Sequence, residues 1–353
     1  MIDSQQLDAY LRAREIQEQF SGVVLITQGE ATLFAGAYGY AHRGWRAPNT
    51  LDVRFDTASV TKLFTAVAAL QMIDRGMFTL GTRAVAYLGL QGTTISPEAT
   101  VFHLLTHTSG IADDADEEAG ERYEDLWRTR PNYAIVETAD FLPQFVYKPA
   151  NFAPGAGCRY NNCAYILLGL MVEKASGLRY RDYVRRHIFA PSGMANSDFL
   201  RMDEVAPNVA EGYAPIVDAA NGDRVIGWKK NIYSYPPVGS PDGGAYVTTS
   251  DLDRFLRCVK AGKLLSPALT AAFFTPQVTC RLMPGGWTKA HGFGLWFYIE
   301  PSGHVLFGEK EGVNVGVSAA IRHFPDQEIN VVLLSNLEEG AWAPLQAIHE
   351  MVA

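Results

Sequence analysis

The sequence predicts a mixed α/β fold in which strands from both ends of the chain form one antiparallel sheet flanked by helices. Six β-rich runs carry this prediction, two near the N-terminus and four near the C-terminus, at 22–27, 32–40, 293–300, 304–307, 314–324 and 328–335. Helical patterns and loops dominate the middle of the chain, from about residue 75 to residue 230. We therefore expect the two ends to build the sheet and the middle to form a large, mostly helical insertion.

The chain has 353 residues, which exceeds the usual size of one domain. We expect residues 1–57 and 285–353 to form the sheet domain and residues 58–284 to form the helical domain, with the active site at their junction. A polar, helix-like segment at 1–20 and a closing helix at 342–352 are expected to flank the strands.

A serine and a lysine lie one helical turn apart at the start of an apolar helix. Ser59 precedes Lys62 by three residues, and apolar residues recur at helical spacing from 63 to 73. Ser59 would lie in the first turn, where free backbone N–H groups and the helix dipole favour a developing anion. If burial lowered its pKa, Lys62 could accept the serine proton. The alternative is a helix cap followed by a solvated lysine.

Composition indicates a protein that acts on small molecules. The chain carries 30 basic and 38 acidic residues, a formal net charge of −8, which disfavours nucleic acid or an anionic membrane as its main partner. No apolar run is long enough to predict a transmembrane helix. The first twenty residues lack the basic and apolar regions of a secretory signal, so we expect a cytoplasmic protein.

The sequence predicts no metal and no cofactor. Its four cysteines form no C-x-x-C pair and no cluster with histidines, so we expect free thiols at Cys158, Cys163, Cys258 and Cys280. His103 and His107 lie four residues apart but lack the glutamate of an H-E-x-x-H motif, which favours packing or capping over metal binding. No nucleotide-binding fingerprint is present.

A glycine-rich loop at 155–162 contains the only Y-x-N spacing in the chain, formed by Tyr160 and Asn162. A phenol near ammonium groups can relay a proton between a serine and a leaving group, and an asparagine two residues later can hydrogen-bond a substrate carbonyl. The spacing alone is weak evidence, because it is expected by chance in roughly one of two chains of this composition.

The third candidate motif is Lys310-Glu311-Gly312, between the runs predicted at 304–307 and 314–324. A strand edge beside the nucleophile could supply the second N–H of an oxyanion hole, which we assign to Val313, paired with the N–H of Ser59. One such donor is typically worth about 3–4 kcal/mol of transition-state stabilisation. The charge of the lysine would influence the protonation of the phenol and of the first lysine.

In this order, the S-x-x-K, Y-x-N and K-x-G motifs resemble those of the serine β-lactamase and penicillin-binding-protein superfamily. The chain most resembles the branch that holds class C β-lactamases and family VIII esterases, which is peptidase S12-like. This resemblance runs nearly end to end and includes the segments His103–Gly110 and Gly243–Leu252.

The resemblance implies a β-lactamase/transpeptidase-like fold and a role for each motif. Ser59 would be the acylated nucleophile, while Lys62 and Tyr160 would share the general base and acid duties. Asn162 would contact the substrate, and Lys310 would supply charge. The sequence leaves open whether the lysine or the phenol takes the serine proton.

Glu311 departs from the pattern of this branch, which usually has threonine, serine or a small residue at that position. In β-lactam and D-alanyl-D-alanine recognition, the hydroxyl and the lysine help to bind a substrate carboxylate, which a glutamate would repel. We therefore expect a serine hydrolase that acts through an acyl-enzyme on a small ester or amide lacking this carboxylate.

Two alternatives remain open from the sequence. One is a β-lactamase, a D-alanyl-D-alanine carboxypeptidase or a D-aminopeptidase, and the other is a non-catalytic acyl-binding sensor of the same fold.

A separate question concerns the acid-rich segment 113–125, which lacks apolar periodicity. We expect a mobile surface loop there. If the loop has a function, we expect it to act as a lid over the site.

Overall fold

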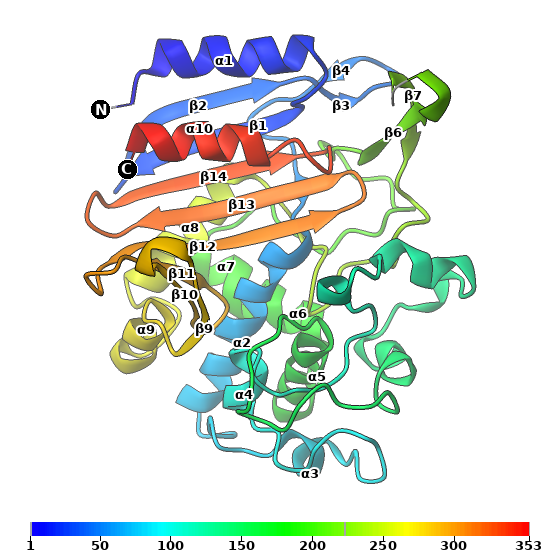
Figure 1. Ribbon diagram of the computed structural model, residues 1–353, viewed down its shortest axis with the longest axis vertical. Coiled ribbons are helices and arrows are strands. Elements are labelled where there is room, and N and C mark those ends of the chain that lie inside the picture. The colour runs from blue at the N-terminus through cyan, green and yellow to red at the C-terminus, as the bar shows by residue number, and fades with distance from the viewer. Residues whose placement is uncertain (1, 222–223, 353) are drawn as a thin grey trace.

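The computed structural model describes residues 2–221 and 224–352. An antiparallel sheet of eight strands joins the two ends of the chain in the order β2-β1-β14-β13-β12-β11-β10-β9 (Figure 1). Its strands are β1 (Gly22–Gln28), β2 (Ala31–Tyr38), β9 (Val278–Leu282), β10 (Thr288–His291), β11 (Trp296–Ile299), β12 (Val305–Asn314), β13 (Val317–Phe324) and β14 (Ile329–Ser335). The predicted antiparallel sheet built from both termini is confirmed.

Three two-stranded ladders accompany this sheet: β3 (Tyr40–His42) with β4 (Ala47–Pro48), β5 (Phe55–Asp56) with β8 (Tyr246–Val247), and β6 (Tyr213–Asp218) with β7 (Arg224–Lys230). The α-helices are α1 (Ser4–Ile16), α2 (Lys62–Asp74), α3 (Ala84–Leu88), α4 (Val101–Leu105), α5 (Cys163–Ser176), α6 (Tyr180–Val184), α7 (Ala190–Ser192), α8 (Thr249–Lys260), α9 (Pro267–Phe273) and α10 (Trp342–Val352). Among the helices of the described residues, none has both the length and the apolar character needed to cross a membrane.

Both faces of the sheet are buried, which explains the continuous apolar runs of its central strands. Successive side chains of a strand point to opposite faces. Along β1, Val23 and Leu25 join the core that includes the helical half of the molecule, whereas Val24 and Ile26 join the core beneath α1 and α10. Figure 1 shows α1 and α10 on one face of the sheet and the helical half, with α2, on the other.

Helix α2 is surrounded by protein on all sides. Its residues from Lys62 to Met72 are all buried, so the helix is more than an amphipathic element with one apolar face. A helix that is apolar all round belongs in the interior of a large protein. The short residues Ala66, Ala68 and Ala69 allow neighbouring elements to approach it, and α5 is the helix that packs most extensively against it.

Two details of the sheet differ from the sequence prediction. Strands β9 and β10 were not predicted, and they extend the sheet beyond β11. The motif Lys310-Glu311-Gly312 lies inside the ten-residue strand β12 rather than between two strands. The proposed division into 1–57 with 285–353 and 58–284 stays a prediction.

The prediction of four free thiols is wrong for two cysteines. Cys158 and Cys280 form a disulfide with a Cα–Cα distance of 5.3 Å, whereas Cys163 and Cys258 are free and buried. The pair is separated by 122 residues, so no local spacing in the sequence indicates it. The contact depends on β9, the edge strand that the sequence did not reveal.

Gly312 lets strand β12 pass directly beside the turn that carries Ser59. A Cβ atom at this position would lie 2.2 Å from the carbonyl oxygen of Thr57 and 2.8 Å from the backbone nitrogen of Ser59. Real Cβ contacts are longer than this, and the nearby atoms belong to the backbone, so they cannot move aside as a flexible side chain would. The strand and the helix start can therefore touch only where the side chain is absent.

We predict that Gly312→Ala lowers the free energy of unfolding by about 1–3 kcal/mol, because the added methyl group overpacks this contact. Equilibrium unfolding in denaturant measures the change. The matched control is Gly81→Ala, whose new Cβ would lie 3.8 Å from its nearest neighbour, the hydroxyl oxygen of Thr79. Equal stability of the two variants would contradict the proposed close contact.

Candidate active site

Ser59 lies in a turn of 3-10 helix, η1 (Ala58–Thr61), directly ahead of α2. The preceding residue, Ala58, has a φ of +42°, a left-handed conformation that costs a non-glycine residue roughly 1–2 kcal/mol. The Ala58 N–H donates to Asp56 Oδ1 at 2.7 Å, and the Ala58 carbonyl accepts the N–H of Gly244 at 3.2 Å. These contacts hold the strained turn that presents the Ser59 hydroxyl.

Lys62 is fully buried, and its Nζ lies within hydrogen-bond distance of three oxygen atoms. They are Ser59 Oγ at 3.0 Å, Asn162 Oδ1 at 2.7 Å and the Asp242 main-chain carbonyl at 2.6 Å. The two carbonyl oxygens can only accept, so the nitrogen donates to both. In a neutral amine these donations use both N–H groups, and the lone pair is then left facing the hydroxyl of Ser59.

Burial also favours the neutral form of this amine. Desolvation lowers the pKa of Lys62 below its ordinary value of 10.5, although the charges of Asp242 and Asp113 act in the opposite direction. No carboxylate of the described residues forms a direct ion pair with Lys62. The arrangement therefore suits an amine that accepts a proton from Ser59.

Tyr160 comes from the glycine-rich loop at 155–162, and its phenol O–H donates to Ser59 Oγ at 2.7 Å. The ring lies close to two lysine amines, with Lys62 Nζ 5.0 Å and Lys310 Nζ 4.7 Å from its centroid. Burial raises the pKa of Tyr160 well above its ordinary value of 10, and the nearby Glu117 adds to this shift. The phenol thus keeps its proton and acts as a donor.

These contacts define one direction of proton transfer, from Tyr160 through Ser59 to Lys62. Tyr160 donates to Ser59, and Ser59 can donate to the lone pair of Lys62. The sequence left open which group takes the serine proton. The geometry and the two pKa shifts favour Lys62 as the acceptor and Tyr160 as the donor.

Asn162 lies just before α5, and its side-chain oxygen accepts a hydrogen bond from Lys62 Nζ. Its backbone N–H donates to the carboxylate of Asp113 at 2.9 Å, and the N–H of Cys163 donates to the same carboxylate at 3.0 Å. Asp113 therefore fixes the start of α5 and, through Asn162, the amine of Lys62. The substrate contact expected of Asn162 stays a prediction.

A cavity of about 390 Å³ opens over Ser59 and Tyr160. The third motif forms one wall of this cavity, because Lys310, Glu311, Gly312 and Val313 all line it, and Glu311 therefore faces the site. Burial lowers the pKa of Lys310 well below its ordinary value, and the nearby Lys62 contributes to the same shift. The third motif and the nucleophile are thus brought together as predicted.

Four further residues of the cavity wall were missed by the sequence reasoning: Glu117, Lys289, Trp296 and Trp342. None belongs to a recognisable motif, and each reaches the cavity only through the tertiary fold. Lys289 and Trp296 come from β10 and β11, and the Lys289 Nζ lies 4.2 Å from the centroid of the Trp296 ring. The charge of Lys289 also acts on Glu311 and lowers its pKa, against the larger effect of burial, which raises it.

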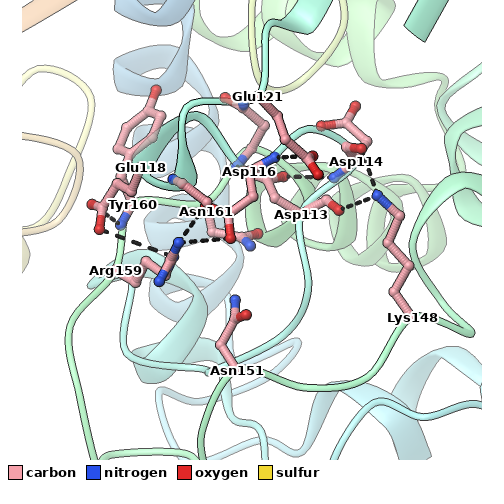
Figure 2. A network of polar contacts seen from close by, with 12 residues as sticks. Asp113, Asp114, Asp116, Glu118, Glu121, Lys148, Asn151, Arg159, Tyr160 and Asn161 are labelled. Carbon is pink, nitrogen blue, oxygen red and sulfur yellow. Dashed lines mark hydrogen bonds and ion pairs between the residues drawn. The ribbon is translucent and has the colours of Figure 1, made fainter.

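The segment 113–125 is only partly the surface loop that we expected, because residues 117–122 are exposed whereas the first three residues are buried. Asp113 and Asp114 are buried, and the Nζ of Lys148 donates to both of their carbonyl oxygens (Figure 2). Farther along, Glu117 lines the cavity beside Tyr160. The segment therefore forms part of the site wall, and whether it moves as a lid stays a prediction.

Figure 2 shows how this segment holds the loop of Tyr160. The guanidinium of Arg159 donates to Asp116 Oδ2 at 2.6 Å, and the backbone N–H of Tyr160 donates to Glu118 Oε1 at 3.2 Å. Arg159 lies between the two carboxylates, because its Nε is also 4.0 Å from Glu118 Oε2. The acidic segment thus fixes one side of the loop that carries the phenol.

The two histidines serve the packing or capping that the sequence favoured for them. His103 completes the N-terminal cap of α4, where its Nδ1 accepts the N–H of Thr100 at 3.3 Å. His107 follows that helix, its Nδ1 accepts the N–H of Asn161 at 3.0 Å, and its ring lies 4.7 Å from the ring of Tyr160. His107 therefore supports the loop of the phenol.

Comparison with known proteins agrees with this geometry. The fold is that of penicillin-binding proteins: the crystal structure of a penicillin-binding protein from Bacillus halodurans matches with a TM-score of 0.87 and 34% sequence identity, over 96% of this chain and 99% of that one. Such a fold with a serine, a lysine and a tyrosine in hydrogen-bond contact defines a serine hydrolase. The family model described as Beta-lactamase matches residues 7–351, and the chain belongs to that family.

Two curated relatives illustrate the range of the family. Esterase EstB of Burkholderia gladioli is 31% identical over 287 residues, which covers 75% of this chain and 71% of the esterase. Penicillin-binding protein 4 of Amycolatopsis lactamdurans is 26% identical over 340 residues, which covers 92% of this chain and 83% of that protein.

We predict that kcat/KM for a neutral ester such as p-nitrophenyl acetate rises with pH and levels off above the pKa of Lys62. Only the neutral amine can accept the serine proton, and burial brings its pKa below 10.5, so protonation removes the base as the pH falls. A pH–rate profile corrected for spontaneous hydrolysis measures this.

The control for this profile is Lys62→Arg, because a guanidinium does not lose its proton. That variant should be inactive at every pH. A profile of the unchanged protein that stays flat or falls with rising pH would exclude Lys62 as the base.

Proposed function

We propose that this protein hydrolyses small carboxylic esters or amides through an acyl-enzyme on Ser59. The observation that carries the proposal is the simultaneous contact of Ser59 Oγ with Lys62 Nζ at 3.0 Å and with the Tyr160 hydroxyl at 2.7 Å. A nucleophilic hydroxyl with a base on one side and a proton donor on the other is the arrangement that acyl transfer requires.

In the acylation step, Ser59 Oγ bonds to the substrate carbonyl carbon while its proton passes to Lys62 Nζ. When the tetrahedral intermediate collapses, the bond from that carbon to the leaving oxygen or nitrogen breaks. The phenol of Tyr160 donates a proton to the leaving group and regains one from the Lys62 ammonium. Water then attacks the acyl-enzyme with the same groups in reverse, which releases the acid and restores Ser59.

The negative oxygen of the intermediate would lie between two backbone donors, the N–H of Ser59 and the N–H of Val313. The support for this pairing is the close passage of β12 beside the Ser59 nitrogen, which the absent side chain of Gly312 permits. Backbone donors fixed in this way stabilise charge that develops in the transition state and cost no reorganisation.

Glu311 favours substrates that lack a carboxylate near the scissile bond. It lines the same cavity as Ser59, and a second carboxylate, Glu117, lines the cavity as well. Lys289 offsets part of the charge of Glu311. The remaining repulsion would act in a partly dry cavity, where charges interact several-fold more strongly than in water. This distinguishes an esterase or amidase from a β-lactamase or a D-alanyl-D-alanine carboxypeptidase.

The cytoplasmic location expected from the sequence stays a prediction, and the disulfide bears on it. Disulfides persist mainly in oxidising compartments and are rare in the cytosol of mesophiles. The Cys158–Cys280 bond therefore favours an oxidising compartment over the cytoplasm.

We predict that Ser59→Ala abolishes hydrolysis of p-nitrophenyl acyl esters and leaves the fold intact, because only the nucleophilic oxygen is removed. Steady-state rates and circular dichroism measure the two properties. The control is Ser302→Ala, which changes a serine in an exposed turn and should keep full activity.

Time-resolved intact mass with the same ester separates a hydrolase from a sensor. A hydrolase gives a transient acyl adduct and continuing turnover, whereas a permanent adduct on Ser59 would identify an acyl-binding sensor. Hydrolysis that survives in Ser59→Ala would refute the proposal.

We predict that Glu311→Thr raises kcat/KM for the carboxylate-bearing β-lactam nitrocefin by about tenfold, because removal of one nearby charge is worth on the order of 1.4 kcal/mol in such a site. Hydrolysis of a neutral p-nitrophenyl ester should change less than about twofold. Nitrocefin turnover is followed by absorbance.

The control for this substitution is Glu311→Gln, which removes the charge and adds no hydroxyl. A similar gain in both variants would assign the effect to charge, and a gain in the threonine variant alone would assign it to the hydroxyl. No gain in either variant would show that Glu311 does not exclude carboxylates.

A further inference from the structure

The single disulfide of the described residues joins the loop of Tyr160 to the edge of the sheet. Cys158 lies two residues before Tyr160, and Cys280 lies in β9, at the far edge of the eight-stranded sheet. The bond therefore connects the segment that carries the phenol to the sheet whose strands β10 and β11 supply Lys289 and Trp296 to the cavity.

The backbone of β9 directs Cys280 toward this loop. Along the ladder between β9 and β10, Lys289 pairs with Arg281 whereas the next residue, Ala290, pairs with Thr279. Cys280 is thus the extra residue of a β-bulge. Bulges re-aim a side chain and are common beside active sites. The edge strand has a local irregularity at the residue that forms the bond.

The loop has different anchors on its two sides. After Cys158, the backbone N–H of Arg159 donates to the His107 carbonyl at 3.0 Å, and the acidic segment holds Arg159 and Tyr160. Before Arg159, no backbone hydrogen bond within the described part of the chain holds Gly157 or Cys158. On that side the nearest backbone anchor is the N–H of Gly155, which donates to the Thr108 carbonyl at 2.8 Å, and the disulfide holds the residues between it and Arg159.

We propose that the Cys158–Cys280 disulfide is a positioning element for Tyr160, so that the oxidised protein is the fully active form. The bond fixes the start of the segment that ends in the phenol, and the phenol must stay at 2.7 Å from Ser59 Oγ to deliver its proton. Small displacements of a catalytic group lower a rate strongly, by as much as about a hundredfold for 1 Å.

The chemistry of the proposed change is thiol–disulfide exchange with a dithiol reductant. One thiolate of the reductant attacks a sulfur of the bond, and its second thiol releases the mixed disulfide. The protein gains two thiols, at Cys158 and Cys280, and the reductant becomes a cyclic disulfide. Both cysteines are partly exposed, so a small reductant can reach them.

A metal site formed by the same two cysteines is less well supported than the disulfide. Cys158, Cys280 and His291 offer ligand atoms within 4.8 Å of one another, and neither ring nitrogen of His291 has a hydrogen-bond partner in the described residues. However, the two sulfur atoms are bonded to each other and are not thiolates, the form of cysteine that binds metals.

The test compares kinetics in the oxidised and the dithiothreitol-reduced protein, at a temperature where both are folded. Thiol counting should give two free thiols before reduction and four after it. We expect kcat for p-nitrophenyl acetate to fall at least about tenfold on reduction, KM to change less than about twofold, and reoxidation to restore kcat.

Substitutions at each end of the bond separate positioning from local damage. Cys280→Ser should reproduce the loss of kcat seen in Cys158→Ser, although the two positions are 122 residues apart, and the double variant should add nothing. Cys258→Ser, at a free thiol of α8, is the matched control and should keep its response to reduction.

A second background tests whether the effect acts through the phenol. Tyr160→Phe removes the donor, so reduction of that variant should change kcat less than about twofold. If reduction lowers kcat equally with and without the phenol, or lowers only the melting temperature, the bond is structural and the inference is wrong.

This inference rests on the proposed function, and a measurement without substrate separates the two. Hydrogen exchange followed by mass spectrometry should show that reduction exposes the amides of 157–162 while those of α2 stay protected. If no ester is hydrolysed but this segment loosens, the proposed function fails and the positioning role stands. If the protein hydrolyses esters and the segment stays protected, the positioning role fails alone.

Discussion

The structure depends on burying the amine of Lys62 inside the protein without a direct carboxylate partner. An isolated ammonium in such a place would be costly, and the pKa of the group falls instead. Helix α2 creates this environment because it is surrounded by protein from Lys62 to Met72. The two carbonyl oxygens of Asn162 and Asp242 then orient the amine and leave its lone pair for Ser59. The apolar packing of one helix thus prepares the base of the site.

The two ends of the chain meet at this helix through strand β12. The sheet needs both termini, because β1 pairs with β14 and β14 leads through β13 to β12. The last residues of β12 extend past β11, whose ladder ends at the pair of Trp296 with Glu309. The edge left free beyond this pair passes Ser59 at Gly312. The topology of the sheet therefore decides where backbone donors can meet the nucleophile.

The parts of the site that could be predicted from the sequence are those with local spacing. Ser59 and Lys62 share one helical turn, and Tyr160 lies in a glycine-rich loop before a clearly periodic helix. The antiparallel sheet was predictable for the same reason, since its central strands are long apolar runs. Lys289 was not predictable, because β9 and β10 are short, half-exposed strands without an apolar pattern. Trp296 lies in the predicted run 293–300, but no local spacing indicates that it reaches the site. The pairing of Cys158 with Cys280 depends on that edge and was missed with it. The burial of Asp113 was also missed, since a run of acids ordinarily indicates a solvated surface. Here the backbone N–H groups of Asn162 and Cys163, at the start of α5, bind the carboxylate.

The acidic residues around the site are most useful after the proton has moved. In the resting protein, burial favours neutral Lys62 and a protonated phenol, so both groups that contact Ser59 favour their uncharged forms. When Ser59 gives up its proton, an ammonium appears at Lys62 inside the protein. The carboxylates of Asp242, Asp113 and Glu117 all favour that charged form, even though none bonds to it directly. Their attraction is therefore larger in the transition state than in the ground state, which is the condition for an interaction to raise kcat. Burial supplies a neutral base, and the acids stabilise its protonated form, so the two effects act at different moments of one reaction.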